Sequence, residues 1–294
     1  MRERNFRQML EERWEKGLFV CVGLDSEFDK IPDSARISYT FSGVSTYGTL
    51  VGFNREIVQA TSDFACAYKP NIAFYEAHGD SGILALRKTI EDIHAYAPDV
   101  PVILDAKRAD IGNTNNGYAE MAFDVLGADA ITVHPYLGSE SLKPFLDRVD
   151  KGVIVLCRTS NPGAGEFQDL PVVYDDLPMM LSSTDTMPLY QYVAHQVTEV
   201  WNRNGNCAVV AGATCPDELR KIRQIVGDMP ILIPGIGAQG GDLEKTVIAG
   251  KDSRGRGMII NSSRGIIFAS KGADFADAAR CETEKLHNLI NQYR

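Results

Sequence analysis

Short apolar runs rich in valine and isoleucine recur along the chain, separated by stretches of mixed polarity. Eight of these runs are apolar at consecutive positions rather than at alternate ones. Strands that are buried on both faces have this pattern, whereas a strand with one face in water alternates. We therefore predict eight buried strands, which lie within residues 18–25, 64–70, 100–107, 129–136, 152–160, 206–213, 230–237 and 257–265.

Each predicted strand is followed by a stretch with the periodicity of an amphipathic helix. These stretches cover residues 54–64, 82–97, 115–127, 141–150, 189–205, 216–227, 242–250 and 273–292. Repeated alternation of strand and helix is typical of an α/β protein, and eight repeats favour a (β/α)8 TIM barrel. A doubly wound sheet is the alternative. It ordinarily has a glycine-rich fingerprint after its first strand, but here that position reads SEFDKIPD.

Length and composition bear on the number of domains. At 294 residues and 44% hydrophobic, the chain has room for one large barrel or for two ordinary domains. No break in composition separates two domains, so we predict a single barrel domain over residues 1–294. Two connections, at 26–50 and 161–188, are longer than ordinary loops. Both follow a strand, so we expect them at the C-terminal face of the barrel, where long loops often form lids.

The chain is acidic, with a formal net charge of −9 and a pI near 5.1. Nucleic acid and anionic membranes need a positive footprint, so we exclude both as partners, whereas an anionic small molecule is compatible with a local positive site. The charged first residues lack the apolar stretch of a secretory signal. No run approaches the ~18 apolar residues of a membrane span. We expect a cytoplasmic protein whose six cysteines are reduced.

Polar side chains gather where the predicted strands end. Asp105 and Lys107 lie at the end of the third strand and Asp110 lies just after it, and so many charges close together are costly unless they compensate one another. An ion-pair network that ties this strand to its helix would be a purely structural explanation. Lys69, at the end of the neighbouring strand, favours a functional cluster, because a second lysine then meets the same carboxylates. The positions expected at one mouth are Asp25, Lys69, Asp105, Lys107, Asp110, Ser160, Gln239 and Arg264.

The last two predicted strands lead into a candidate phosphate site. PGIGAQGGD at 234–242 is a glycine-rich loop that opens a helix, and SSRG at 262–265 places Arg264 beside exposed amides. Loops after strands seven and eight of such barrels commonly bind phosphate through backbone N–H groups. A tight turn alone would explain the glycines, but a guanidinium group beside them suits a phosphate.

These motifs together resemble the orotidine 5'-phosphate decarboxylase family, which carries out the last step of de novo UMP synthesis. DAKRADIGNT at 105–114 is similar to the family signature, and VGLD at 22–25 and YKPN at 68–71 are similar to its first two strand ends. SNPGA at 160–164 and the two phosphate motifs resemble the rest. The long connections resemble those of the longer, type 2 branch. The matching motifs are spread over the whole predicted barrel, so the resemblance is specific.

The resemblance implies a homodimer that acts on orotidine 5'-phosphate without a cofactor. It implies a charge network of Lys69, Asp105, Lys107 and Asp110, with Asp110, Ile111 and Thr114 reaching into the site of the partner subunit. It also implies that Asp25 binds ribose hydroxyls with Asn71 as a further substrate contact, that Ser160 binds the pyrimidine edge, and that Pro234, Gln239, Ser263 and Arg264 belong to the phosphate end. Ser263 is a departure, since many members have glycine there, and the amide approach to phosphate is expected to differ.

The charges also suit this chemistry on physical grounds. Loss of CO2 from a ring carbon leaves an electron pair that the ring π system cannot accept, and the sequence has no cofactor motif to accept it. The protein must then supply a preorganised ammonium group beside that carbon, and Lys107 fits this role and can protonate C6. Asp105 would repel the substrate carboxylate, although we expect transition-state stabilisation to be the larger effect. No ligand set for a metal is present, so we expect none.

Three other functions stay open at this point. Mg²⁺-dependent sugar-phosphate decarboxylases and synthases of the same barrel superfamily have a similar D-x-K-x-x-D block, but with an acidic residue where this chain has Lys69, and a lysine there would repel the metal. A Schiff-base aldolase would need a neutral amine on Lys69 or Lys107, which the adjacent Asp105 disfavours. A barrel that binds phosphate without catalysis is the third.

Overall fold

Eight parallel strands form the centre of the molecule. The computed structural model describes residues 4–39, 43–173, 186–237 and 240–294. The strand order is β4-β1-β12-β11-β10-β7-β6-β5, and parallel bridges from Tyr68 to Val102 and from Asn71 to Asp105 join β4 to β5. The predicted (β/α)8 barrel is therefore confirmed. Its strands are β1 (Val20–Leu24), β4 (Ala65–Pro70), β5 (Ile103–Arg108), β6 (Ala130–Val133), β7 (Gly152–Arg158), β10 (Cys207–Ala211), β11 (Ile231–Pro234) and β12 (Met258–Ser262).

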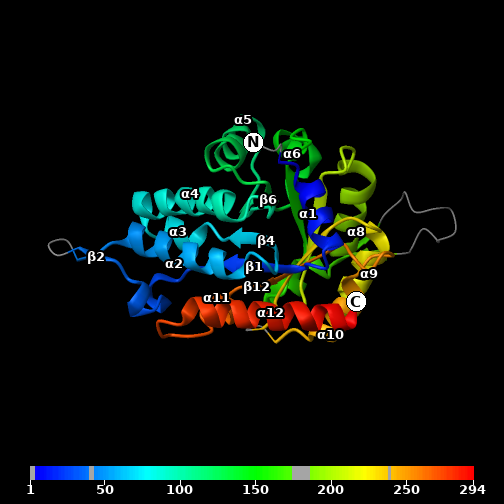
Figure 1. The fold of residues 1–294 in the computed structure, drawn as a ribbon. Coiled ribbons are helices and arrows are strands. Elements are labelled where there is room, and N and C mark those ends of the chain that lie inside the picture. Colours follow the sequence, from blue (N-terminus) through cyan, green and yellow to red (C-terminus); the bar gives the residue numbers. More distant parts are fainter. Residues whose placement is uncertain (1–3, 40–42, 174–185, 238–239) are drawn as a thin grey trace.

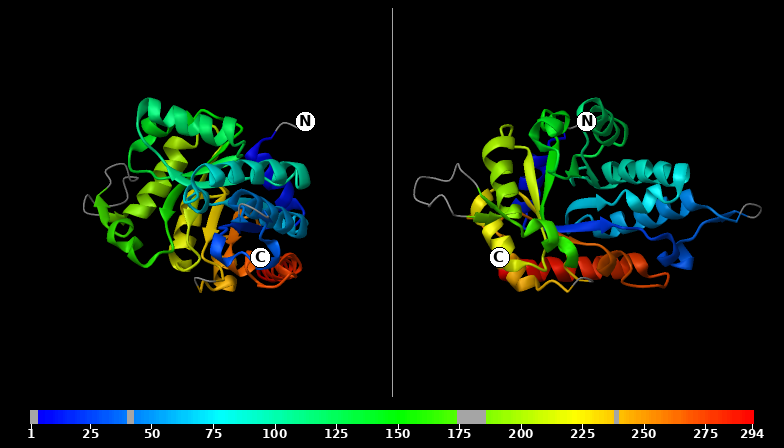
Figure 2. Two further views of the ribbon diagram at one scale, coloured as in Figure 1. Left: turned by 90° about the vertical axis from the view of Figure 1, so that its left-hand side faces the viewer. Right: turned by 180° about the vertical axis from the view of Figure 1, so that it is seen from behind.

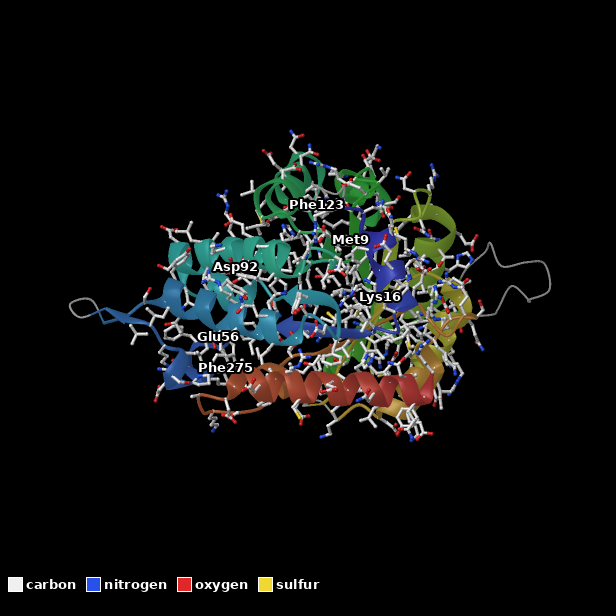
Figure 3. All side chains as sticks on the ribbon, viewed as in Figure 1. Met9, Lys16, Glu56, Asp92, Phe123 and Phe275 are labelled. Carbon is white, nitrogen blue, oxygen red and sulfur yellow. The ribbon has the colours of Figure 1, made fainter. Side chains whose placement is uncertain are left out.

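Helices cover the outside of the barrel, as the three views show (Figures 1 and 2). The long helices α4 (Gly79–Tyr96), α2 (Thr46–Thr61) and α12 (Phe275–Tyr293) run side by side next to β1 and β4. Phe275, labelled in Figure 3, stacks on Phe53 of α2 with the ring centroids 5.2 Å apart. Further helices are α3 (Ala73–Glu76), α5 (Gly112–Ala119), α6 (Gly138–Leu146), α8 (Leu189–Gln196), α9 (Pro216–Val226), α10 (Leu243–Gly250) and α11 (Arg264–Ile267), with π-helical segments at Glu120–Val125 and Val197–Trp201.

The N-terminal helix α1 (Phe6–Glu15) closes one end of the barrel instead of joining its outer wall. Trp14 Nε1 donates a hydrogen bond of 2.8 Å to the carbonyl of Met258, where β12 begins. Arg13 Nε donates one of 2.9 Å to the carbonyl of Ala65, where β4 begins. Because α1 contacts the starts of the strands, the opposite end, where the strands finish, is the end left for a site.

The connection after β1 is shorter than predicted. It contains 3₁₀ turns and two short antiparallel strands, and α2 begins at Thr46, whereas the sequence pattern predicts a loop to residue 50 and a helix from residue 54. Ser45 caps this helix by accepting a hydrogen bond of 3.0 Å from the N–H of Gly48. Two glycines in the first turns hide the helical pattern in the sequence. The short elements are 3₁₀ turns Phe28–Lys30 and Asp33–Ala35 and strands β2 (Ser38–Tyr39) and β3 (Gly43–Val44).

The connection after β7 also has structure of its own. A 3₁₀ turn (Pro162–Ala164) and α7 (Gly165–Gln168) lead to β8 (Pro171–Val173), which pairs antiparallel with β9 (Thr186–Pro188). Residues 174–185 of this connection lie outside the described residues. Both long connections follow strand ends, as predicted, and their role as lids stays a prediction.

Along several strands the buried positions change from apolar to polar. In β4, Ala65 and Ala67 precede Lys69 at every second position, so the three share one face of the strand. The same change occurs in β5, where Ile103 is followed by Asp105. The polar residues therefore meet at the C-terminal end of the barrel. Within the described part of the chain, no helix has the length and apolar character needed to cross a bilayer.

Candidate active site

The C-terminal ends of the strands surround a cavity of about 280 Å³. Most of the residues singled out in the sequence line it, although they come from different ends of the chain. These are Asp25, Lys69, Asn71, Asp105, Lys107, Ser160, Pro234, Ser263 and Arg264. Gln239 lies outside the described residues, so its placement stays a prediction.

Lys69, Asp105 and Lys107 form a continuous ion-paired cluster in this cavity. Lys69 Nζ lies 3.0 Å from Asp105 Oδ2, and Lys107 Nζ lies 2.6 Å from Asp105 Oδ1. Asp25 extends the cluster, with its Oδ1 at 3.8 Å from Lys69 Nζ. The Lys69 side chain is only 4% exposed, whereas that of Lys107 is 50% exposed. Lys107 is therefore the lysine whose ammonium group is open to a ligand.

Mutual attraction keeps the buried members of the cluster charged. Burial disfavours the charged form of Asp105, but Lys69 and Lys107 outweigh it and hold the pKa of Asp105 well below its usual range. Burial likewise disfavours the charged form of Lys69, and Asp105 and Asp25 outweigh it, so the pKa of Lys69 lies above its ordinary value. Near neutral pH the cavity therefore contains fixed charges of both signs.

An irregular end of β5 places this cluster. The pairing of β5 with β6 shifts register between Leu104 and Arg108. Within this irregular stretch Lys107 has a φ of 48°, and no other non-glycine residue of the described chain has a positive φ. Side-chain-bearing residues rarely adopt this conformation, because the Cβ atom crowds the backbone. The turn directs the Lys107 side chain back toward Asp105.

Thr132 of β6 holds this turn and was missed in the sequence. Its Oγ1 accepts hydrogen bonds from the N–H groups of Ala106 and Lys107, at 3.0 and 2.9 Å. The same hydroxyl donates to Asp105 Oδ1 at 2.9 Å. The signal for it was slight, since Thr132 is one polar residue within an apolar run. Other polar residues that line the cavity and were not predicted as site residues are Thr159, Asn161 and Asn261.

The phosphate motifs supply another part of the cavity lining. Gly235, Gly265 and the exposed Arg264 border the cavity. Ser263 lies against β1 so closely that a Cβ atom added to Gly23 would be 1.9 Å from Ser263 Oγ. Glycine at position 23 therefore makes room for the serine hydroxyl beside the arginine.

Asp110, Ile111 and Thr114 lie away from this cavity in the single chain. Asp110 Oδ1 accepts a hydrogen bond of 2.7 Å from the N–H of Ile111, and Asn115 Oδ1 accepts one of 2.8 Å from the N–H of Asp110. Ile111 is 65% exposed. Within one chain the cavity thus contains three members of the predicted charge network, and Asp110, which the resemblance assigns to the partner subunit's site, is not among its lining residues.

Comparison with known proteins identifies the family. The model of the "Orotidine 5'-phosphate decarboxylase / HUMPS family" matches residues 20–279, which span the barrel. The chain belongs to this family. The resemblance drawn from the sequence motifs is thereby confirmed.

Relatives within the family match the chain over its length. An orotidine 5'-phosphate decarboxylase from Cupriavidus metallidurans is 49% identical over 290 residues, which cover 98% of each chain. The solved structure of Leishmania donovani OMP decarboxylase has a TM-score of 0.78 and 36% identity, and the match covers 99% of this chain and all of that one. Leishmania donovani UMP synthase gives a TM-score of 0.82 at 38% identity; 99% of this chain matches only 56% of that longer chain.

Proposed function

We propose that this protein decarboxylates orotidine 5'-phosphate to UMP at the cavity of the barrel mouth. The observation that carries the proposal is the ion-paired alternation of Lys69, Asp105 and Lys107, with both Asp105 oxygens paired to lysines. Family membership and the names of the relatives support it. A lysine at position 69, within reach of Asp25 and Asp105, also argues against a Mg²⁺ ion bound between those carboxylates.

In this proposal Lys107 is the catalytic proton donor. The bond between C6 and the carboxylate breaks, CO2 leaves, and the electron pair stays on C6. The ammonium group of Lys107 stabilises that charge and then transfers a proton to C6 to give UMP. Asp105 is placed to repel the substrate carboxylate, and Lys69 keeps Asp105 charged. Burial of Lys69 and Asp105 strengthens the attraction between them, because the dielectric constant around buried charges is low.

The remaining cavity residues would hold the rest of the substrate. Asp25 Oδ1 is buried without a hydrogen-bond partner among the described residues, so it can accept one from a ribose hydroxyl. The proposed substrate contacts are Asp25 for the ribose hydroxyls, Asn71 as a further contact, Ser160 for the pyrimidine edge, and Pro234, Gln239, Ser263 and Arg264 for the phosphate. Phosphate binding far from C6 would contribute energy for ordering the site.

We also propose that the working unit is a homodimer in the cytoplasm. Asp110, Ile111 and Thr114 lie outside their own cavity, and the 65% exposure of Ile111 supports a role at an interface with a second copy. All six cysteines are free, and four of them are buried, which suits a reducing compartment.

An absorbance assay with orotidine 5'-phosphate in the presence of a chelator tests the proposal. We expect conversion to UMP and CO2 at a rate that EDTA does not change, because the lysines already supply positive charge. Activity that EDTA abolishes and Mg²⁺ restores would instead favour a metal-dependent sugar-phosphate enzyme. Inactivation by borohydride in the presence of a sugar phosphate would indicate a Schiff base. If neither orotidine 5'-phosphate nor a sugar phosphate is turned over, the remaining hypothesis is a barrel that binds phosphate without catalysis.

A further inference from the structure

We propose that Thr132 is a positioning residue for the decarboxylation, which holds the Lys107 backbone and the Asp105 carboxylate in place through one hydroxyl group. The inference rests on the proposed function and adds a residue that the sequence motifs do not include. Thr132 lies on β6, borders the cavity and is 1% exposed. It acts on the reacting groups through Asp105 and Lys107.

The position of the hydroxyl proton follows from the three partners of Thr132 Oγ1. The N–H groups of Ala106 and Lys107 can only donate, and they lie 3.0 and 2.9 Å from this oxygen. A hydroxyl has two acceptor lone pairs and one proton, so both lone pairs are occupied. The proton is left for Asp105 Oδ1 at 2.9 Å, which can only accept as a carboxylate. A residue without a hydroxyl at position 132 would remove one hydrogen bond from each of these three partners.

The two amide bonds secure an unfavourable backbone conformation. Lys107 has a φ of 48°, which persists only where the surroundings determine it. Thr132 supplies that constraint from the neighbouring strand, where its β-branched side chain is stiff. Because the Lys107 side chain starts from this backbone, the direction of its ammonium group depends on these bonds.

The third bond sets the rotation of the Asp105 carboxylate. Asp105 Oδ1 accepts hydrogen bonds from Thr132 and from Lys107, the latter at 2.6 Å. Oδ2 accepts one from Lys69 at 3.0 Å. Thr132 thereby assigns one carboxylate oxygen to each lysine. Rotation of this group would move the charge that faces the substrate carboxylate and release Lys107 from its partner.

A pair of substitutions tests the role of the hydroxyl. Thr132→Val keeps the shape and removes the hydroxyl, and we expect kcat to fall by roughly 10²-fold, the cost of a misplacement of about 1 Å, with a much smaller change in KM. Thr132→Ser restores the hydroxyl, and we expect kcat to return to near that of the parent. The matched control is Thr283→Val on α12, where a fully buried hydroxyl donates only within its helix, to the Ala279 carbonyl. It should reduce Tm without changing kcat.

The outcomes separate this inference from the proposed function. A folded Thr132→Val protein with parental kcat overturns the inference, and so does a folded Thr132→Ser protein as impaired as Thr132→Val. If Thr132→Val fails to fold, as judged by thermal melting and gel filtration, Thr132→Ala replaces it under the same criteria, because it places no extra methyl group against the two amides. A failure of the proposed function would appear earlier, as an unsubstituted protein that does not decarboxylate orotidine 5'-phosphate.

Discussion

Asp105 is the residue on which the charged cluster depends. It accepts from Lys69, Lys107 and Thr132, and it is buried between them. A carboxylate buried among two ammonium groups is stable only while all of them stay charged. At the scale of single residues, the cluster therefore predicts how stability depends on pH and how substitutions change the rate and the ligand affinity.

The charge of Asp105 should contribute to the stability of the folded protein, and acid should remove this contribution. Because its folded pKa lies below the ordinary value of 3.8, its contribution is fully present above that value and is lost as the pH falls through the folded pKa. We expect Asp105→Asn to lower the free energy of unfolding by about 3 kcal/mol near neutral pH, since it leaves two buried or half-buried ammonium groups without their partner. Urea unfolding at several pH values should show this difference shrinking below about pH 4. A difference that grows in acid would contradict the assignment.

Removing the lysine that faces the cavity should affect rate more than binding. We expect Lys107→Ala to lower kcat by more than about 10³-fold, because the ammonium group acts mainly on charge that develops in the transition state. Steady-state kinetics with orotidine 5'-phosphate and calorimetry with UMP measure the two effects separately. If KM alone rose and kcat were retained, the proposed role of Lys107 would be wrong.

Arg264 should distinguish ligands that carry a phosphate from those that do not. A charge-assisted hydrogen bond contributes about 1.5–3 kcal/mol, so we expect Arg264→Ala to weaken UMP binding by roughly 10- to 100-fold. Uridine lacks the phosphate and should be affected little. Titration calorimetry with both ligands gives the comparison, and equal weakening would place Arg264 away from the phosphate.

At the scale of elements, a buried hydrogen-bond network joins the end of β1 to α2, α3 and α4. Ser26 Oγ donates to Asn54 Oδ1 at 2.6 Å. Asn54 Nδ2 donates to the hydroxyls of Tyr75 and Thr89 at 3.0 and 3.1 Å, and Tyr75 donates to the Leu24 carbonyl at 3.3 Å. The helices thereby hold the segment after β1, which carries Asp25 between Leu24 and Ser26.

Asn54→Leu should break this network and loosen Asp25, which directly precedes Ser26. We expect a loss of roughly 1–3 kcal/mol in the free energy of unfolding, because buried partners lose their hydrogen bonds, together with a higher KM. Asn206→Leu is the matched control, since the buried Asn206 amide donates to three carbonyls near the start of β7, at the other end of the barrel. It should cost similar stability with an unchanged KM. Equal changes in KM for both variants would refute the link to Asp25.

At the scale of the whole molecule, the two ends of the barrel have different roles. Helix α1 closes the end where the strands begin, and the cavity lies where they finish. Asp110 and the exposed Ile111 lie on the same side as the cavity but outside it. A second copy docked on that side would bring these residues toward a neighbouring cavity, which is the arrangement proposed above.

Complementation tests the shared site. Mixing inactive Lys107→Ala and Asp110→Ala proteins should assemble heterodimers in which one site has both defects and the other has neither, so roughly a quarter of all sites are intact after random exchange. We expect activity to return in that proportion. Native mass spectrometry confirms that subunits exchange, and exchange without recovered activity would mean that Asp110 serves its own subunit.

Sequence alone determined the barrel and most of the cavity lining. A strand buried on both faces must be apolar throughout, so its ends and any charge there stand out, as with Lys69 and Asp105.

Only the tertiary structure decided the rest. Thr132 acts across strands through its hydroxyl, and α1 closes the barrel through contacts with distant strand starts. Asp110 follows Asp105 and Lys107 closely in the sequence, yet only those two line the cavity. Such relations depend on which strands are neighbours and how the backbone turns, and linear patterns do not encode either.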